Sequence, residues 1–164
     1  MDRFVVEGGV TLRGSVEISG AKNSALPVLA ACLLTSDPVV LHRIPRVKDI
    51  RTMMDLLVHM GAGLSDSGSG PVTVTAGDQL RPEAPYEVVK TMRASSLVLG
   101  PLVGRFRRAR VSLPGGCAIG ARPIDLHMRG LEQLGARIEQ THGYIEATAP
   151  DGLRGATVHF DRIT

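Results

Sequence analysis

The chain contains an internal repeat, and this repeat restricts its possible folds more than any other feature of the sequence. Residues 12–78 and residues 80–151 carry the same pattern of apolar residues and glycines, shifted by about 73 positions. The correspondence is clearest where Met60–Ala62 matches Leu134–Ala136. Two tandem copies of one unit predict two equivalent groups of helices and strands that pack side by side.

Each copy is expected to contain the element order strand, helix, strand, helix, strand, strand. Gly61 should end the second helix of the first copy, because glycine adopts the left-handed conformation after a helix without steric cost. Apolar alternation and helical periodicity predict, in the first copy, strands at 15–18 and 39–41, helices at 23–34 and 48–60, and a hairpin with strands at 62–64 and 72–76.

The second copy predicts helices at 90–103 and 123–134 around a strand at 110–113, although Gly100 and Pro101 weaken the first of these helices. A third copy begins with Leu153-Arg154-Gly155, which repeats the Leu-Arg opening of the other two. This third unit, 153–164, stops where its first helix is expected. We therefore interpret the chain as the N-terminal part of a longer protein with an α/β (α+β) fold.

Composition and charge exclude several classes of protein. Two Tyr, three Phe and no Trp leave few aromatic faces for stacking on bases. A net charge of +3 suits small anionic ligands better than nucleic acid. Two cysteines form no disulfide framework, and no Cys/His cluster has the spacing of a zinc site. We expect no nucleic-acid partner, no metal and no cofactor.

The N-terminus and the hydropathy predict a cytoplasmic protein that contacts no membrane. Met1–Phe4 lacks the order of basic, apolar and small residues that marks a signal peptide. The longest apolar run, Ala25–Leu34, is far shorter than the ~20 residues that a membrane span requires.

The first candidate site is Gly20–Ser24, between an expected strand and an apolar helix. Free N–H groups and the positive end of the dipole at the start of a helix, joined by the side chains of Lys22 and Asn23, suit an anionic ligand. The alternative is structural: Asn23 or Ser24 caps the helix, and Lys22 is only solvated.

The second candidate site is Pro114–Pro123, where three glycines surround Cys117 ahead of a helix. A thiol near Arg122 in an exposed loop should have a lowered pKa, which suits acid, base or nucleophilic chemistry. The alternative is a small buried cysteine beside glycines that only form turns. Cys32 lies inside an apolar helix and is expected to be buried and inert.

Three further features surround these sites. Arg93 is equivalent in the second copy to the Lys22 region, so it is expected to bring a second cation to the same end of the molecule, unless it is only a surface residue. The basic run Arg105–Arg110 is interpreted as a solvated turn. His127 is expected to be a polar neighbour of the site and not a metal ligand.

The segments Gly20–Asn23, Arg93–Ser95, Pro114–Gly120 and Arg122–His127 together resemble the enolpyruvyl transferase family in order and spacing. The resemblance covers essentially the whole chain. It implies an inside-out α/β barrel of repeated βαβαββ units, of which two complete units and the start of a third are present. It also implies that segment 1–21 pairs with a second domain, whereas 22–164 form an incomplete first domain.

More narrowly, the chain resembles family members that transfer the enolpyruvyl group of phosphoenolpyruvate to the 3-hydroxyl of UDP-N-acetylglucosamine. In that resemblance Cys117 donates the proton to the methylene carbon, forms a thioether adduct with phosphoenolpyruvate and is alkylated by fosfomycin. The carboxylate base belongs to the second domain and is absent here. The substrate-binding residues implied are Lys22, Asn23, Arg93, Arg122, Pro123, Ile124, Asp125, Leu126, Arg162, Ile163 and Thr164.

Two alternatives stay open. A sister enzyme of the same family acts on shikimate 3-phosphate, but it does not use a thiol such as Cys117. A non-catalytic protein that binds a nucleotide sugar would not need the second domain. The incomplete first domain should also expose apolar helix surface, which predicts self-association and no activity for the 164-residue chain alone.

Overall fold

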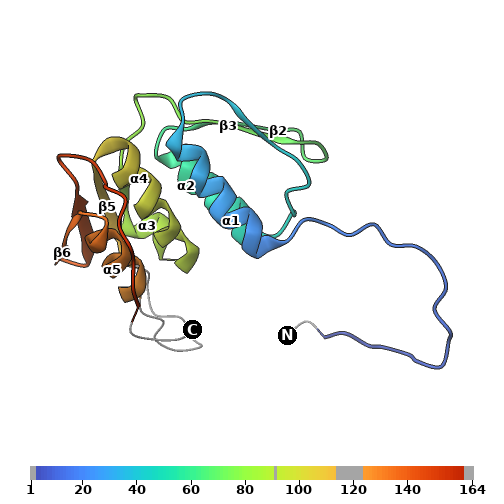
Figure 1. Ribbon diagram of the computed structural model, residues 1–164. Helices are drawn as coiled ribbons and strands as arrows, with labels where there is room; N and C mark the ends of the chain where they lie inside the picture. The colour runs from blue at the N-terminus through green and yellow to red at the C-terminus, as the bar shows by residue number, and fades with distance from the viewer. Residues whose placement is uncertain (1–2, 91, 114–123, 161–164) are drawn as a thin grey trace.

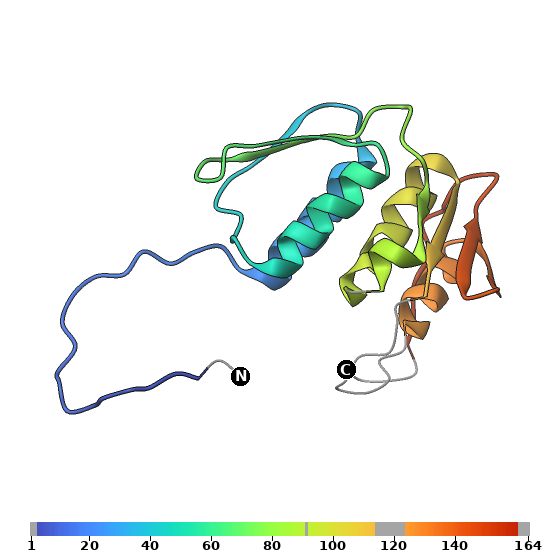
Figure 2. The ribbon, with the colours of Figure 1, turned by 180° about the vertical axis from the view of Figure 1, so that it is seen from behind.

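Both copies of the repeat form a layer of helices packed on a sheet, and the two layers lie next to each other (Figures 1 and 2). The computed structural model describes residues 3–90, 92–113 and 124–160. An extended N-terminal arm, residues 3–20, runs away from this body (Figure 1). None of the helices in the described ranges is long and apolar enough to cross a membrane.

The first unit contains a three-stranded antiparallel sheet in the order β1-β3-β2. Val39 pairs with Val74 and Gly63 pairs with Thr75, which confirms the predicted hairpin. Gly61 has φ 103° just after the second helix, so its expected role at the helix end is confirmed. The elements are α1 (Lys22–Ala31), η1 (Cys32–Leu34), β1 (Val39–Leu41), α2 (Lys48–His59), β2 (Gly63–Asp66) and β3 (Val72–Thr75).

The second unit contains a four-stranded sheet in the order β4-β5-β7-β6, in which β4 runs parallel to β5. His142 and Gly143 join β6 to β7 with φ of 51° and 79°, the positive values that a tight two-residue hairpin turn requires. The elements are β4 (Glu83–Ala84), α3 (Tyr86–Val89), η2 (Arg93–Val98), α4 (Leu99–Phe106), β5 (Arg108–Ser112), α5 (Asp125–Gln133), β6 (Arg137–Thr141) and β7 (Tyr144–Thr148).

The predicted strand at 15–18 is wrong. These residues form no ladder, and Val16 and Ile18 are 87% and 82% exposed. The equivalent segment of the second unit is β4, which pairs with β5, whereas β1 pairs with β3 alone among the described strands. Alternation predicts which residues can form a strand, but a strand also needs a partner edge.

The predicted helix at 90–103 is wrong in its continuity. The helical run begins at Arg93 and consists of η2 and α4, whereas Met92 has an extended backbone (φ −143°, ψ 112°) that separates this run from the short helix α3 before residue 90. Pro101 is the third residue of α4 and is accommodated within the continuous helical run of η2 and α4. The other helices match their predicted ranges to within a few residues.

The hydrophobic core lies where the helices of the two units meet. Leu29 of α1 and Leu33 of η1 are fully buried, as are Leu99 and Leu102 of α4. The expectation that these helices expose much apolar surface is therefore wrong for these faces. The most exposed of the large apolar side chains lie instead on the arm, where Phe4 is 98% exposed.

Arg105, at the end of α4, ties the second unit to the first. Its Nη1 donates to the main-chain oxygens of Leu33, Thr35 and Ala76 at 3.0, 2.9 and 2.6 Å. Its Nη2 lies 3.0 Å from an Asp78 carboxylate oxygen, and the Arg105 side chain is only 14% exposed. These contacts join the end of η1, the end of β3 and the linker between the units.

The interpretation of Arg105–Arg110 as a solvated turn is therefore wrong. Arg107 has φ 60° at the end of α4 and donates to the Pro150 oxygen at 2.7 Å. Arg110 lies on β5 and forms ion pairs with Glu83 and Glu146. Charge density along the sequence predicted solvent exposure, but most of these guanidinium groups serve as hydrogen-bond donors within the fold.

Candidate functional site

Gly20 determines where the first helix begins. A Cβ built on Gly20 would lie 1.9 Å from the main-chain oxygen of Arg43, so only glycine permits this close approach. Arg43 follows β1, and its φ of 54° turns the chain toward α2. The glycine of the Gly20–Ser24 segment thus fixes the start of α1 against the end of β1.

The start of α1 offers free donors to an anion. Ala21 precedes the helix and provides no side-chain cap. The N–H groups of Ser24 and Ala25 donate to Ala21, whereas those of Lys22 and Asn23 have no partner within the described residues. The alternative that Asn23 or Ser24 caps this helix is therefore wrong, and the donors remain available for a ligand.

Lys22 is not simply solvated. Its Nζ lies 2.7 Å from a carboxylate oxygen of Asp49, the second residue of α2. The two side chains are 46% and 42% exposed. A lysine at the first position of a helix is electrostatically unfavourable by itself, since it adds positive charge to the positive end of the dipole. Asp49 compensates for this charge from the neighbouring helix.

The residues predicted from the second copy lie at the same edge of the body. The starts of α1, α2, η2 and α5 all face the lower edge in Figures 1 and 2. Arg93 is the first residue of η2, and the hydroxyl of Ser95 donates to the Met92 oxygen at 2.6 Å, which fixes this turn. Asp125 is the first residue of α5.

A hollow of about 340 Å³ lies beside the start of α5. Leu126 and His127 line it together with Leu97 of η2 and Phe160, and most of its lining is apolar. Ile124 is 6% exposed and belongs to the core. The structure thus brings Leu126 next to η2, but buries Ile124 away from solvent.

Six predicted site residues lie outside the described ranges. These are Cys117, Arg122, Pro123, Arg162, Ile163 and Thr164. Within the described ranges, no group of His, Cys, Asp and Glu side chains is arranged to hold a metal ion.

Cys32 is buried, as predicted. Its side chain is 3% exposed, and its thiol donates to the Val28 oxygen at 3.4 Å. Burial raises the pKa of this thiol above its ordinary value, although its backbone hydrogen bonding opposes the shift. Since the thiolate is the reactive form, Cys32 should be a poor nucleophile.

We therefore expect an alkylating reagent to modify Cys117 at least about tenfold faster than Cys32 in the folded protein. Mass spectrometry of peptides after timed quenching measures both rates in one sample. Unfolding in guanidinium is the control, and it should bring the two rates together. Equal protection of both thiols in the folded protein contradicts the interpretation of Cys117 as an exposed loop thiol.

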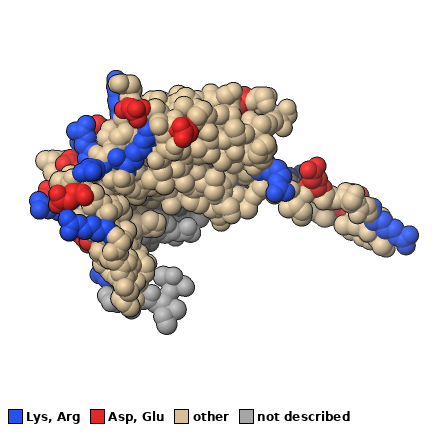
Figure 3. All heavy atoms as spheres, turned by 45° about the horizontal axis from the view of Figure 1, so that its top comes forward, with Lys and Arg blue, Asp and Glu red and all other residues tan. Residues whose placement is uncertain are grey.

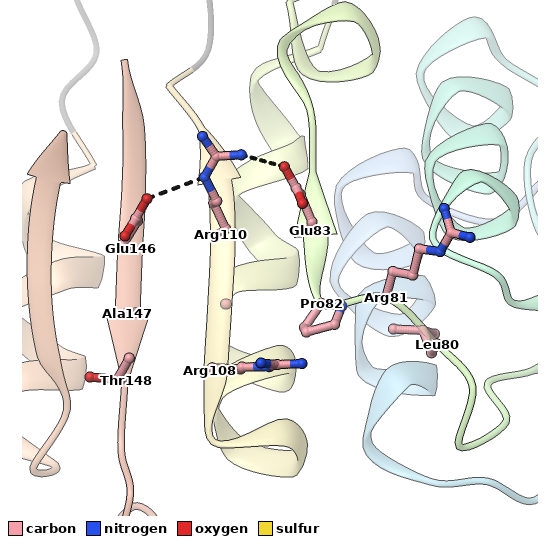
Figure 4. Close-up of a pocket in the computed structure, with 10 residues that line it drawn as sticks. Leu80, Arg81, Pro82, Glu83, Arg108, Arg110, Glu146, Ala147 and Thr148 are labelled. Carbon is pink, nitrogen blue, oxygen red and sulfur yellow. Dashed lines mark hydrogen bonds and ion pairs between the residues drawn. The ribbon is translucent and has the colours of Figure 1, made fainter. Parts of the chain in front are cut away.

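A second hollow, of about 500 Å³, lies over strands β4, β5 and β7 of the second unit. Charged side chains of both signs gather at the end of the body far from the arm (Figure 3). In the hollow itself, Arg110 lies between Glu83 and Glu146, with its guanidinium 3.8 Å from the centre of the Tyr144 ring (Figure 4). Its charge is already neutralised, and none of the predicted site residues lines this hollow.

Sequence reasoning missed Asp49. It lies 27 positions from Lys22, and no spacing rule predicts a contact over that separation. The available signal was that Asp49 is the acidic residue in the first turn of the predicted helix at 48–60.

The comparisons with known proteins point to one family. A profile of EPSP synthase (3-phosphoshikimate 1-carboxyvinyltransferase) matches residues 6–163. UDP-N-acetylglucosamine 1-carboxyvinyltransferase of Solibacter usitatus (strain Ellin6076) is 69% identical over 164 residues, which are 100% of this chain and 39% of that protein. The protein of the same name from Anaeromyxobacter sp. (strain Fw109-5) is 57% identical, again over 100% of this chain, and 40% of that protein is covered.

Solved structures agree on the fold. The enolpyruvyl transferase NikO from Streptomyces tendae has a TM-score of 0.72 and 27% identity over 87% of this chain and 31% of that chain. EPSP synthase from Acinetobacter baumannii has a TM-score of 0.68 over 92% of this chain and 36% of its own, and at 18% identity this likeness concerns the fold alone. Because the profile spans nearly all of these 164 residues, the chain belongs to the EPSP synthase (3-phosphoshikimate 1-carboxyvinyltransferase) family.

Proposed function

We propose that this chain is the N-terminal part of an enzyme that transfers the enolpyruvyl group of phosphoenolpyruvate to the 3-hydroxyl of UDP-N-acetylglucosamine and releases phosphate. This reaction is the first committed step of peptidoglycan synthesis, and we place it in the cytoplasm. The observation that carries the proposal is the 69% identity over the whole chain to a protein named for this activity. The chain spans 39% of that relative, so the proposal concerns a longer protein.

The described site supports an anionic substrate. Phosphoenolpyruvate carries a carboxylate and a phosphate, and both need cations and N–H donors. Lys22 and the free N–H groups of Lys22 and Asn23 offer these at the start of α1. In this proposal Arg122 joins Lys22 in holding the two anionic groups, and Arg93 and Asn23 contact the substrates at the same edge.

The chemistry consists of an addition followed by an elimination. The sugar 3-hydroxyl gives its proton to the carboxylate base of the second domain as its oxygen forms a bond to the carbon that bears the phosphate, while Cys117 gives its proton to the methylene carbon. The phosphate then leaves with its bridging oxygen and the bonding electron pair, and the new methyl group returns a proton to the Cys117 thiolate, which restores the double bond and the thiol. Cations on the carboxylate and phosphate favour the charge distribution of the oxocarbenium-like transition state.

We assign the remaining predicted site residues to binding of the nucleotide, and the sheets and the arm to the architecture of the longer protein. Leu126 lines the hollow beside α5, and we propose that Pro123–Leu126 frame the uracil while Arg162–Thr164 contact the diphosphate. We further propose that the two sheets belong to an inside-out barrel of three repeated units, and that the arm, within segment 1–21, pairs with a second domain. The exposed apolar residues of the arm support this role.

The experiment that tests the proposal is a measurement of phosphate release by the full-length protein. We expect release only when phosphoenolpyruvate and UDP-N-acetylglucosamine are both present, with the enolpyruvyl sugar nucleotide as the product in mass spectrometry. Each substrate omitted in turn is the control. The 164-residue chain alone should show no turnover, since it lacks the carboxylate base, and the exposed apolar residues of its arm should favour self-association.

The alternatives predict different results. Turnover with shikimate 3-phosphate in place of the sugar nucleotide identifies the sister activity. Saturable binding of UDP-N-acetylglucosamine without phosphate release identifies a non-catalytic binding protein. Either outcome overturns the proposal.

A further inference from the structure

We infer that Asp49 is a positioning residue that holds the Lys22 ammonium in place for the anionic substrate, an inference that rests on the function proposed above. The carboxylate of Asp49 lies 2.7 Å from Lys22 Nζ. The two residues come from adjacent helices that begin at the same end of the first unit (Figure 2). Within the described residues Asp49 contacts no cation besides Lys22, so its effect on a ligand would act through Lys22.

The surroundings explain why Lys22 needs such a partner. It is the first residue of α1, Lys48 is the first residue of α2, and both helix starts lack a side-chain cap. The two helix dipoles therefore place positive charge near the ammonium and favour its movement into solvent. In the first turns of these two helices, Asp49 is the acidic residue that opposes this repulsion.

The pair is too exposed to contribute much to folding. Exposed ion pairs have small effects on stability, because both charges are well hydrated in the absence of the contact. The contact does favour one conformation of the Lys22 side chain, whose four-carbon stem is flexible. An ammonium has three N–H donors, and the single contact to Asp49 leaves two for a ligand. The gain is a cation already in position before the substrate arrives.

In the full-length enzyme, Asp49→Ala should raise the KM for phosphoenolpyruvate about tenfold and leave the KM for UDP-N-acetylglucosamine within about twofold of the original value. Asp49→Asn retains an oxygen that accepts from the ammonium, so it should recover part of the loss. Asp55→Ala is the matched control, because Asp55 is an exposed carboxylate on the same helix with no described partner. This variant should leave both KM values unchanged.

A double-mutant cycle separates a positioning role from an independent one. If Asp49 acts through Lys22, then adding Asp49→Ala to Lys22→Ala should cause no further rise in the KM for phosphoenolpyruvate. Additive effects of the two substitutions overturn the inference. So does a normal KM in Asp49→Ala, or an Asp49→Asn variant as impaired as Asp49→Ala.

The cycle also distinguishes this inference from the proposed function. If Lys22→Ala raises the KM for phosphoenolpyruvate and Asp49→Ala does not, only the positioning role of Asp49 fails. If Lys22→Ala itself leaves that KM unchanged, the anion-binding role of Lys22 fails and the inference fails with it. Far-ultraviolet circular dichroism and denaturation midpoints confirm that each variant is folded.

Discussion

Replacing Cys117 with alanine in the full-length enzyme should lower the turnover number by about a thousandfold or more. Alanine has no proton to give, and general acid catalysis typically contributes 10²–10⁴-fold. The measurement is the initial rate of phosphate release at saturating phosphoenolpyruvate and UDP-N-acetylglucosamine. The KM values should change much less than the turnover number, because in the proposed mechanism the substituted group acts on the reacting carbon.

Two further variants sharpen this test. Cys32→Ala is the control, since that thiol is buried in the core and should leave the rate unchanged. Cys117→Asp should retain part of the activity, with its optimum at lower pH, because a carboxyl group with an ordinary pKa of about 3.9 loses its proton at a lower pH than a thiol does. Near-original rates in Cys117→Ala would show that another group is the proton donor.

Replacing Arg105 with alanine should lower the free energy of unfolding by about 2–4 kcal/mol. The guanidinium donates to three main-chain oxygens and pairs with Asp78 while only 14% exposed, so its removal leaves acceptors from three segments without their donor. Urea denaturation measures the change. Arg105→Lys should lose about half as much, since one ammonium keeps the charge but cannot reach as many acceptors.

Arg108→Ala is the matched control for this prediction. Arg108 lies three residues further along, is exposed and has no described partner, so its removal should change stability by no more than about 0.5 kcal/mol. Hydrogen exchange adds a local measurement: in Arg105→Ala, peptides covering residues 33–35 and 76–78 should exchange faster than other parts of the core. Equal stability of the Arg105 and Arg108 variants contradicts the role of Arg105 in joining the units.

The features that sequence reasoning predicted well depend on local chemistry. The range of α2 follows from its apolar periodicity and from Gly61, whose positive φ ends the helix. The hairpin of β2 and β3 follows from two strand segments around a Ser/Asp/Gly turn. The repeat then extends these predictions to the second unit, which explains why β6, β7 and α5 were also expected.

The features that it missed depend on contacts between distant segments. The strand at 15–18 fails because its pairing partner is not decided by its own residues. Arg105 donates to acceptors that are 29–72 positions away in the sequence. The run of arginines therefore indicates a charged segment, but its neighbours in the sequence do not indicate which acceptors it binds. Asp49 contacts Lys22 because two helices begin at one edge, and helical periodicity determines which face is buried but not which helix ends meet.

The same distinction applies to the candidate site. Lys22 and Asn23 were identified because a helix start with unpaired N–H groups is a general anion-binding arrangement, and that arrangement is present. The burial of Ile124 was not expected, because its place in a binding motif gives no sign that its side chain also belongs to the packed core. The roles of Cys117 and Arg122 remain predictions that rest on the family resemblance.

The close approach of Gly20 to the Arg43 oxygen has a consequence for inhibition and resistance. Gly20 lies two residues before Lys22, and a side chain there would push the beginning of α1 away from β1. An inhibitor that binds the Lys22 ammonium could therefore lose affinity through a substitution at a position it never touches. Resistance of this kind would displace a cation without removing it. It would also weaken the binding of every anion that uses the same donor, including the natural substrate.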